Sequence, residues 1–325
     1  MILAGDVGGT KAHLALYAPG SSVRTPVIER RLPSREYATL EALVREFLAG
    51  APARPSRVVL GIAGPVVEQR IEATNLPWTI GAAALSAELD GIPVLLVNDL
   101  EATAWGLPLL AGEEIETLHP GTPRPGNRVL IAAGTGLGEA LLIQDGQTWR
   151  PCASEGGHSD FAPRDALEDE LLLWLRARYG RVSYERILSG PGLANLYRFF
   201  AATGRGNASD EVAARFETAA DPAAVVSEAA LDGSCGRARL ALERFVSIYG
   251  AEAGNLALKA LAVNGIFIGG GIAPRILPLL RSGGFLAALH DKGRLGPVLA
   301  GIPVTVLRDD RAALWGAAHL ALAGA

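Results

Sequence analysis

A chain of 325 residues, with 49% hydrophobic and 20% charged residues, is long enough for two domains or for one large domain with insertions, and has the composition of an ordinary globular enzyme. Its formal net charge of −4, without a basic run, argues against nucleic acid as the main partner. Its two cysteines, Cys152 and Cys235, form no CxxC pair, which argues against a disulfide framework and against a structural zinc site.

No apolar stretch of the sequence reaches the length of a membrane span. The first predicted strand starts at Ile2, which leaves no room for a signal peptide. Together with the unpaired cysteines, these features predict a protein of the reducing cytoplasm that has no membrane partner.

The chain opens with a strand that leads into a glycine turn. Apolar residues from Ile2 onward precede Gly5-Asp6-Val7-Gly8-Gly9-Thr10, and residues 11–17 then alternate as a returning strand. Glycines beside a carboxylate and a hydroxyl suit a turn whose backbone N–H groups face an anion. Because a strand follows this turn, it is neither a P-loop nor a Rossmann loop, both of which open into a helix.

Strands and helices then follow one another up to residue 97. The patterns predict a third strand at 27–32, a helix at 39–48, a buried strand at 57–63, a short hairpin at 66–73, a helix at 80–89 and a buried strand at 93–97. This is the pattern of an α/β protein.

Asn98 and Asp99 follow the buried strand 93–97 directly, and a helix is predicted at 101–110. Polar residues at the carboxyl end of such a strand lie where ligands bind in open α/β sheets. The alternative is that both residues only cap the next helix. Position alone leaves the two possibilities open.

The opening pattern recurs after residues 119–127, a stretch rich in proline and glycine that is the best candidate for a linker. A strand at 129–133 leads into Gly134-Thr135-Gly136-Leu137-Gly138, and a strand at 140–143 follows. One glycine-rich loop is a weak signal, but two hairpins of this form indicate a duplicated domain with a phosphate held between the two turns.

Two acidic residues and a histidine follow this second hairpin. The paired glycines of residues 154–161 predict a loop, so Glu155 and His158 are not a metal-ligand pair on a helical face. An ordinary solvated turn remains the alternative for this loop. For Glu185, in a short helix that Ser183 can cap, the alternative is a partner of the helix dipole.

The remainder of the chain is mostly helical. Helices are predicted at 165–179, 193–202, 210–220, 222–231, 237–261 and 312–322, with a break at 189–192. A strand from Gly265 feeds the glycine turn Gly269-Gly270-Gly271, a candidate nucleotide-facing turn, and a last strand is predicted at 302–307.

Six of these stretches carry a resemblance. They are GDVGGT (5–10), VND (97–99), AAGTGLG (132–138), SEGGHSDFAP (154–163), ERILSGPGLANLY (185–197) and IFIGGGIAPR (266–275). In this order and spacing, the chain resembles the bacterial glucokinases of the non-ROK type, in the hexokinase–actin superfamily, over essentially its whole length. ROK-type sugar kinases carry a cysteine-rich zinc motif that the two separated cysteines here cannot supply.

The resemblance implies a two-domain α/β fold of the actin-like ATPase (ribonuclease H-like) type, with a cleft between the domains. It places a small domain at residues 1–109 plus about 305–325 and a large domain at 110–304. We also expect a homodimer, which apolar chains of this type often form.

The resemblance also assigns roles to residues. ATP phosphates are expected at the first turn, which comprises Gly5, Asp6, Val7, Gly8, Gly9 and Thr10, and at the second turn through Gly134, Thr135, Gly136 and Gly138. Gly269, Gly270 and Gly271 are expected near the adenosine. Glucose contacts map onto Asn98, Asp99, Glu155, His158 and Glu185, with Asp99 as the catalytic base. Asp6 is expected to anchor Mg²⁺, through water.

The implied reaction transfers the γ-phosphoryl group of ATP to the 6-hydroxyl of glucose, giving glucose 6-phosphate that feeds glycolysis. One alternative is a kinase for another hexose or an amino sugar. Another is an actin-like ATPase without a sugar substrate, against which the Glu155, His158 and Glu185 constellation argues. The chain departs from the family pattern at Lys11, where Asn is usual, and at Ser159, where an apolar residue is often seen.

Overall fold

The computed structural model describes residues 1–72 and 78–323. The chain divides into two compact units. The first unit comprises Met1–Glu114, Arg150–Ala153 and Asp309–Ala325, and the second comprises Ile115–Trp149 and Ser154–Arg308.

The first unit is built on a five-stranded sheet of order β3-β2-β1-β4-β7. Its strands are β1 (Ile2–Val7), β2 (Lys11–Tyr17), β3 (Ile28–Pro33), β4 (Arg57–Ile62) and β7 (Val94–Asn98). β1 pairs antiparallel with β2 and parallel with β4, which in turn runs parallel to β7. The predicted N-terminal hairpin and the two buried strands are therefore confirmed.

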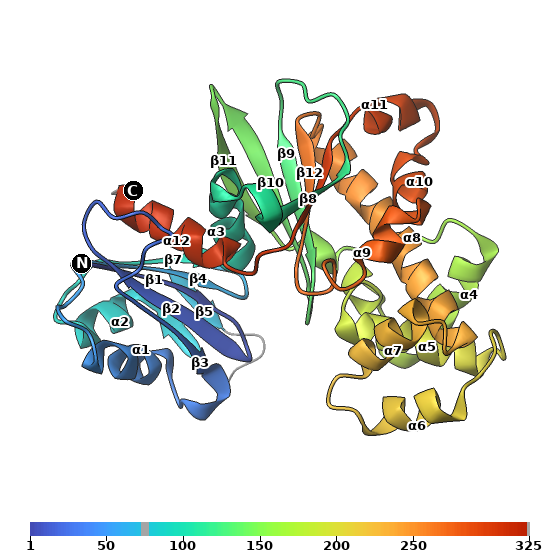
Figure 1. The fold of residues 1–325 in the computed structure, drawn as a ribbon, viewed down its shortest axis with the longest axis horizontal. Helices are drawn as coiled ribbons and strands as arrows, with labels where there is room; N and C mark the ends of the chain where they lie inside the picture. The colour runs from blue at the N-terminus through green and yellow to red at the C-terminus, as the bar shows by residue number, and fades with distance from the viewer. Residues whose placement is uncertain (73–77, 324–325) are drawn as a thin grey trace. The chain divides into compact units, whose positions relative to one another are not determined.

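Helices cover both faces of this sheet (Figure 1). Alternate residues of a strand point to opposite faces. Leu3 and Val7 of β1 share a core with α1 (Leu40–Ala49) and α2 (Ala82–Glu88). Ile2 and Ala4 instead share a core with α3 (Asp99–Gly106) and α12 (Ala312–Ala323). Asp6 has the same parity as Ile2 and Ala4, so its side chain belongs to the face that α3 and α12 cover.

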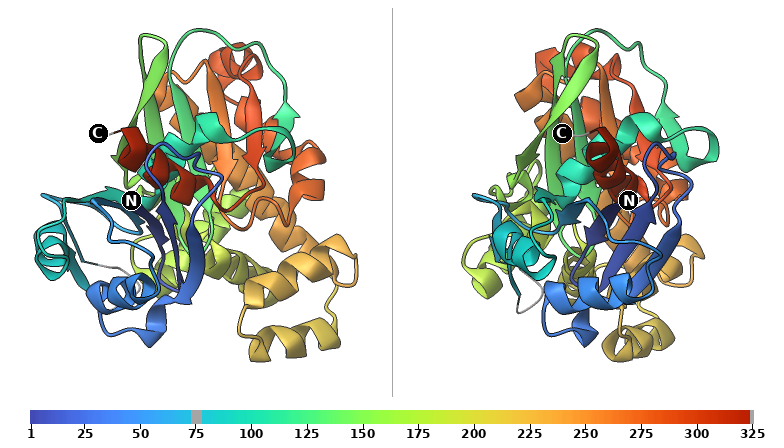
Figure 2. Two further views of the ribbon diagram at one scale, coloured as in Figure 1. Left: turned by 60° about the vertical axis from the view of Figure 1, so that its left-hand side comes forward. Right: turned by 90° about the vertical axis from the view of Figure 1, so that its left-hand side faces the viewer.

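The C-terminal helix α12, red in Figures 1 and 2, packs closely against α3. Small residues permit this approach. A Cβ at Gly316 would lie 1.8 Å from the carbonyl oxygen of Ala102, and a Cβ at Gly106 would lie 2.0 Å from that of Ala312.

We expect Gly316→Ala to destabilise the first unit by about 1–3 kcal/mol, because the added methyl group meets helix backbone that has no room to move. Calorimetry should show a lower Tm. Gly284→Ala is the control, since a Cβ at Gly284 meets nothing within 4 Å. An unchanged Tm for Gly316→Ala would contradict the close packing of α3 on α12.

The second unit contains a six-stranded sheet of order β11-β10-β9-β12-β13-β8, apart from residues 150–153 of its edge strand. The strands are β8 (Ile115–His119), β9 (Arg128–Ala133), β10 (Leu137–Asp145), β11 (Thr148–Ser154), β12 (Gly265–Gly269) and β13 (Val304–Leu307). β9 pairs antiparallel with β10 and parallel with β12, and β12 runs parallel to β13. The order β11-β10-β9-β12-β13 thus repeats the order β3-β2-β1-β4-β7 of the first sheet, and these three pairings have the same directions as their counterparts there, as the repeated sequence pattern predicts.

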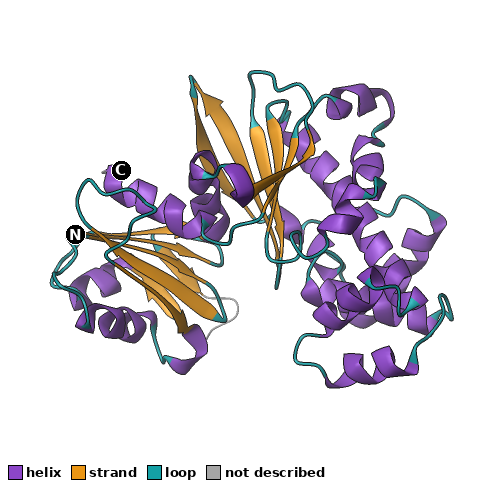
Figure 3. Cartoon of the chain, in the orientation of Figure 1, coloured by secondary structure: helices purple, strands orange, loops and turns teal. Residues whose placement is uncertain are grey.

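The helices of the second unit gather beside its sheet (Figure 3). They are α4 (Ala166–Tyr179), α5 (Gly190–Ala202), α6 (Asp210–Thr218), α7 (Pro222–Leu231), α8 (Gly236–Ala260), α9 (Leu277–Arg281), α10 (Gly284–His290) and α11 (Gly296–Ala300). The long helix α8 is central, since it packs against α5, α7, α10 and strand β9.

Three local predictions are corrected by the structure. Residues 119–127 do not link the units, because they lie within the second one, where the Thr122 N–H donates to the carbonyl of Gly301. Ile80 belongs to strand β6 (Thr79–Gly81), paired with β5 (Arg70–Glu72), so the helix α2 begins only at Ala82. Residues 190–192 do not break a helix but form the first turn of α5, where proline needs no N–H partner.

The predicted hairpin at 66–73 contains one bridge, between Val67 and Arg70, and its last residue lies outside the described residues. In the described part of the chain, we find no helix that combines the length and the apolar character needed to cross a membrane.

Candidate active site

The first glycine turn joins β1 to β2 and is held at both ends. The Gly8 N–H donates to the carbonyl of Lys11 at 3.0 Å. Ser34, fully buried, donates its hydroxyl to the carbonyl of Gly8 at 2.8 Å and its N–H to that of Thr10 at 3.1 Å. Sequence reasoning missed Ser34, because a single serine after a strand carries no pattern of its own. Its two bonds fix the turn expected to face phosphate.

Three carboxylates from distant parts of the chain interact beside this turn. Asp6 is the penultimate residue of β1, on the face covered by α3 and α12. Asp99 is the first residue of α3, and Asp310 lies just before α12. Burial, and next the charge of Asp99, raise the pKa of Asp6 to about 7, with Asp310 adding to the shift and Lys11 and Arg31 opposing it. The first unit therefore holds a concentration of negative charge at the end of its first strand.

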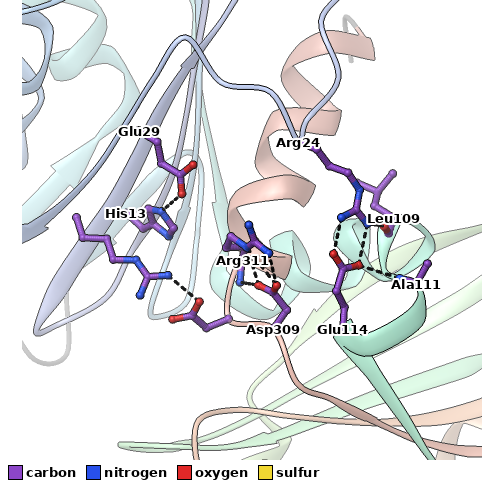
Figure 4. A network of polar contacts seen from close by, with 10 residues as sticks. His13, Arg24, Glu29, Leu109, Ala111, Glu114, Asp309 and Arg311 are labelled. Carbon is purple, nitrogen blue, oxygen red and sulfur yellow. Dashed lines mark hydrogen bonds and ion pairs between the residues drawn. The ribbon is translucent and has the colours of Figure 1, made fainter.

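Lys11 and Arg31 offset part of this charge through Asp310. The Lys11 ammonium lies 3.1 Å from one Asp310 oxygen and the Arg31 guanidinium 2.7 Å from the other. Burial acts in the opposite direction, but these two cations hold the pKa of Asp310 below its usual range. Figure 4 shows the neighbouring contacts, in which Arg311 is bonded to Asp309. Lys11, at which the chain departs from the family pattern, thus forms an ion pair with Asp310 in the C-terminal segment.

Asn98 caps helix α3, as the alternative raised for it predicts. Its side-chain oxygen accepts from the N–H groups of Leu100 at 2.9 Å and Glu101 at 3.2 Å. Its amide donates to the carbonyl of Gly64 at 3.1 Å, and the residue is only 5% exposed. One amide hydrogen remains for a substrate, so a contact of Asn98 with sugar stays a prediction.

Asp99 is partly exposed, and one of its carboxylate oxygens accepts from the Leu100 N–H at 2.9 Å. Gly61 allows helix α3 to pack closely on the sheet. A Cβ at Gly61, on β4, would lie 2.8 Å from the Cβ of Ala102 and 3.7 Å from the Cα of Asp99. Because Gly61 has no side chain, the first turn of α3 lies directly on the sheet, which fixes the position of Asp99.

The second glycine turn, in the second unit, is held by residues far along the chain. The Gly134 N–H donates to the carbonyl of Gly136, and the Gly190 N–H to that of Gly134, both at 2.8 Å. The Leu137 N–H donates to Glu185 Oε2 at 3.0 Å, and a Cβ at Gly136 would lie 2.5 Å from the same oxygen. Gly138 lies outside the turn, because it is part of β10 and pairs with Ala132.

The third glycine turn lies beside the second one. Gly269 ends β12 and pairs with Ala132 of β9. Gly270 has a φ of +80°, and a Cβ there would lie 2.2 Å from the carbonyl oxygen of Ala133, so only glycine fits. The Ile272 N–H donates to that same carbonyl at 3.2 Å. The structure therefore brings together the turns at 134–136 and 269–271.

Glu155, His158 and Glu185 also converge in the second unit. His158 Nε2 lies 3.8 Å from Glu155 Oε2, and His158 Nδ1 lies 3.8 Å from Glu185 Oε1. The Glu155 and His158 side chains are about half exposed and that of Glu185 is 29% exposed. Glu185 accepts the Leu137 N–H, which comes from a distant part of the chain, so it does more than interact with a helix dipole. The same carboxylate thus connects the second glycine turn with the 155–158 loop.

Arg181 bonds residues of the 155–160 loop, and no signal in the sequence pointed to it. Its guanidinium donates to the carbonyl of His158 at 2.5 Å and forms an ion pair with Asp160 at 2.7 Å. Within the loop, a Cβ at Gly157 would lie 2.1 Å from the carbonyl oxygen of Leu137. The loop backbone therefore lies flat on β10, and the paired glycines are a packing requirement.

Comparisons with known proteins agree with this arrangement. The family model described as Glucokinase matches residues 3–323. A curated glucokinase of Nostoc sp. is 39% identical, with 98% of each chain covered. The crystal structure of a glucokinase from an Antarctic psychrotroph is 31% identical, with 98% of each chain covered and a TM-score of 0.81.

A ROK family glucokinase from Streptomyces griseus, solved in complex with glucose and AMPPNP, is 22% identical, with a TM-score of 0.65 and 98% of each chain covered. At that identity the likeness concerns the fold alone. The predicted α/β fold of the actin-like ATPase type is confirmed by these structural neighbours. The family match and the full-length similarity to curated relatives show that the chain belongs to the glucokinase family.

Proposed function

We propose that this chain phosphorylates the 6-hydroxyl of glucose with ATP as the phosphoryl donor, giving glucose 6-phosphate. The observation that carries the proposal is the convergence of Glu155, His158 and Glu185 beside a glycine turn. A sugar presents donors and acceptors that must each be paired when they are buried, and two carboxylates and an imidazole supply such partners. Asn98, with its remaining amide hydrogen, is the proposed fourth contact.

Asp99 is the proposed general base. A sugar hydroxyl is a poor nucleophile at neutral pH, so a positioned carboxylate must take its proton during attack. Asp99 is the first residue of α3 and is partly exposed, which supports its assignment as the base.

ATP is proposed as the donor because two glycine turns occupy equivalent places in the two sheets. Their backbone N–H groups suit phosphate oxygens, and the turn at 269–271 is proposed to lie near the adenosine. The Streptomyces griseus glucokinase, which shares the fold, was solved with the ATP analogue AMPPNP.

Mg²⁺ fits the first unit, where Asp6 and Asp99 carry mutually repelling carboxylates. Among the described residues, no three His, Cys, Asp or Glu side chains form a metal cluster. Asp6 would therefore hold the ion through water, with phosphate oxygens as its other ligands, as Mg²⁺ in phosphoryl-transfer sites commonly is held. When bound, the ion neutralises charge on the transferring phosphoryl group.

The two units are proposed to be the small and large domains, with boundaries at Glu114 and Asp309 in place of 109 and about 305. The homodimer and the cytoplasmic location stay predictions.

A coupled assay tests the proposal. Glucose, mannose, fructose and N-acetylated sugars are compared, each with several nucleotides. We expect glucose with ATP to give the highest kcat/KM, because a hydrogen-bonded site can discriminate against a missing or misplaced hydroxyl by ~10⁴. Preference for another sugar would replace the substrate assignment, and an ATPase rate that no sugar stimulates would revive the actin-like alternative.

Lys11 provides a separate prediction about nucleotide affinity. We expect Lys11→Asn to raise the KM for ATP roughly three- to tenfold and to leave the KM for glucose unchanged, because it removes a cation beside the proposed phosphate site. The effect is modest because the Lys11 side chain is 56% exposed. Arg45→Ala, which removes a surface ion pair with Glu88, is the control. An unchanged KM for ATP would show that Lys11 serves only its ion pair with Asp310.

A further inference from the structure

A buried carboxyl group lies directly beneath the proposed sugar-binding loop, and the proposed reaction does not use it. Glu139, on β10, is 1% exposed. Among the described residues, neither of its side-chain oxygens has a hydrogen-bond partner. Burying a carboxylate without a partner is strongly unfavourable, so the position of this group needs an explanation.

The Glu139 carboxyl is in contact with the loop backbone. A Cβ at Gly156 would lie 2.0 Å from Glu139 Oε2 and 3.0 Å from its Cδ. Gly156 adjoins Glu155, begins the helical turn Gly156–His158 and accepts the Ser159 N–H at 2.8 Å. The carboxyl group thus supports the segment that carries both Glu155 and His158.

The charged groups that act on Glu139, Glu252 and Lys259, come from α8 and form an ion pair with each other. The buried Glu252 accepts from Asn255 at 2.8 Å and from Lys259 at 3.4 Å. The Tyr249 hydroxyl accepts from the N–H of Ala133 and lies 3.2 Å from the carbonyl of Ile131. In the part of the chain that the structure describes, no cation bonds Glu139 directly, whereas the charge of Glu252 lies near enough to repel it.

We propose that Glu139 is a positioning residue whose neutral carboxyl supports the 155–158 loop, and that its ionisation loosens the hold of this loop on the sugar. The inference rests on the proposed function, which makes this loop the sugar-binding element. An ionised carboxylate needs hydrogen bonds from water or from N–H groups to be stable when buried. The 155–158 loop is the element that lies against Glu139 Oε2. Charging Glu139 therefore favours a displaced loop, in which His158 no longer meets Glu185.

The charges around Glu139 place this transition near neutral pH. Burial, and then the charge of Glu252, raise the pKa of Glu139 to about 7, while Lys259 acts in the opposite direction. Tyr184, which faces the same cluster through Asn255, has a raised pKa of its own and stays neutral in this range. Glu139 is therefore neutral below about pH 7 and charged above it, so sugar affinity falls as pH rises.

The first test compares the wild-type protein with Glu139→Gln, in which the side chain has a similar shape but stays neutral. We expect the wild-type KM for glucose to rise at least fivefold between about pH 6 and about pH 8.5, since affinity falls up to about tenfold per pH unit above the pKa. Glu139→Gln should match the wild type at the lower pH and stay within about twofold across the range. The KM for ATP should follow the same course in both proteins. His158 is present in both, so the difference between the two profiles reports on Glu139 alone.

The second test addresses the contact itself and does not depend on Glu139→Gln folding well. Gly156→Ala should raise the KM for glucose about tenfold in the wild-type background and much less in a Glu139→Ala background, because the side chain that the new methyl group meets is then gone. Gly157→Ala is the matched control. Its methyl group meets the backbone of Leu137, so Glu139→Ala should not rescue it.

The outcomes are distinguishable. A wild-type protein without glucose phosphorylation overturns the proposed function and, with it, this inference. Glucose phosphorylation with parallel pH profiles for wild type and Glu139→Gln, or equal rescue of Gly156→Ala and Gly157→Ala by Glu139→Ala, overturns the inference alone.

Discussion

Replacing Asp99 with Asn is expected to lower kcat about 10²–10⁴-fold, which is the usual contribution of a positioned general base. The asparagine side chain keeps an oxygen that can accept the Leu100 N–H, as Asp99 does at 2.9 Å. The start of α3 should therefore be preserved, and the loss should arise in the chemical step. Steady-state kinetics with glucose and ATP measure it.

Glucose binding should survive in part in this variant, because Glu155, His158 and Glu185 are untouched. A glucose-induced rise in Tm reports on that binding separately from turnover. Asp90→Asn is the matched control in the first unit, since Asp90 is exposed, has a φ of +58° and occupies a conformation that asparagine accepts well. A kcat for Asp99→Asn within tenfold of the wild type would assign the base to another residue.

Replacing Glu185 with Ala is expected to lower kcat/KM for glucose about 10²–10³-fold. The change removes a carboxylate proposed to bond the sugar, and hydrogen bonds to charged groups contribute about 1.5–3 kcal/mol each. It also removes the acceptor of the Leu137 N–H and the contact with His158, so the glycine turn and the loop lose their common partner. Glu185→Gln keeps one oxygen for Leu137 and should fall between the wild type and Glu185→Ala.

Glu228→Ala is the control for this prediction, because Glu228 forms an exposed ion pair with Arg215 at 2.9 Å on the helical part of the same unit. Its kcat/KM should stay within about twofold of the wild type, as is usual when an exposed ion pair is lost. If Glu185→Ala lowered Tm and left the KM for glucose unchanged, Glu185 would be a structural acceptor for Leu137 and not a sugar contact.

The elements that the sequence predicts well are the buried ones. Both glycine hairpins, the buried strands and the long helix α8 are confirmed, because a strand or helix packed against a core repeats its apolar residues at the period of its geometry. Strands β8 and β11 were missed. Each is the last strand at one end of the six-stranded sheet, where half-exposed residues and Pro151 weaken the alternation.

The candidate site was likewise predicted only in part from the sequence. Glycine-rich segments and polar residues after buried strands point to a nucleotide and a sugar, because such positions in α/β sheets lie where ligands bind. The residues next to Asn98 in the sequence did not show whether it caps a helix or binds a ligand. Its bonds to Leu100, Glu101 and Gly64 show that it caps the helix, and its contact with a sugar stays a prediction.

The sequence by itself determined the fold class, the two glycine hairpins and the kinds of side chain available for the chemistry, because these depend on local periodicity and on motifs a few residues long. Only the tertiary structure decided which charges meet. Asp6, Asp99 and Asp310 interact because one face of β1 is covered by α3 and α12, and Glu139 lies under Gly156 because the paired glycines let a loop rest on β10. Contacts between residues so far apart in the chain depend on packing, and no local pattern encodes them.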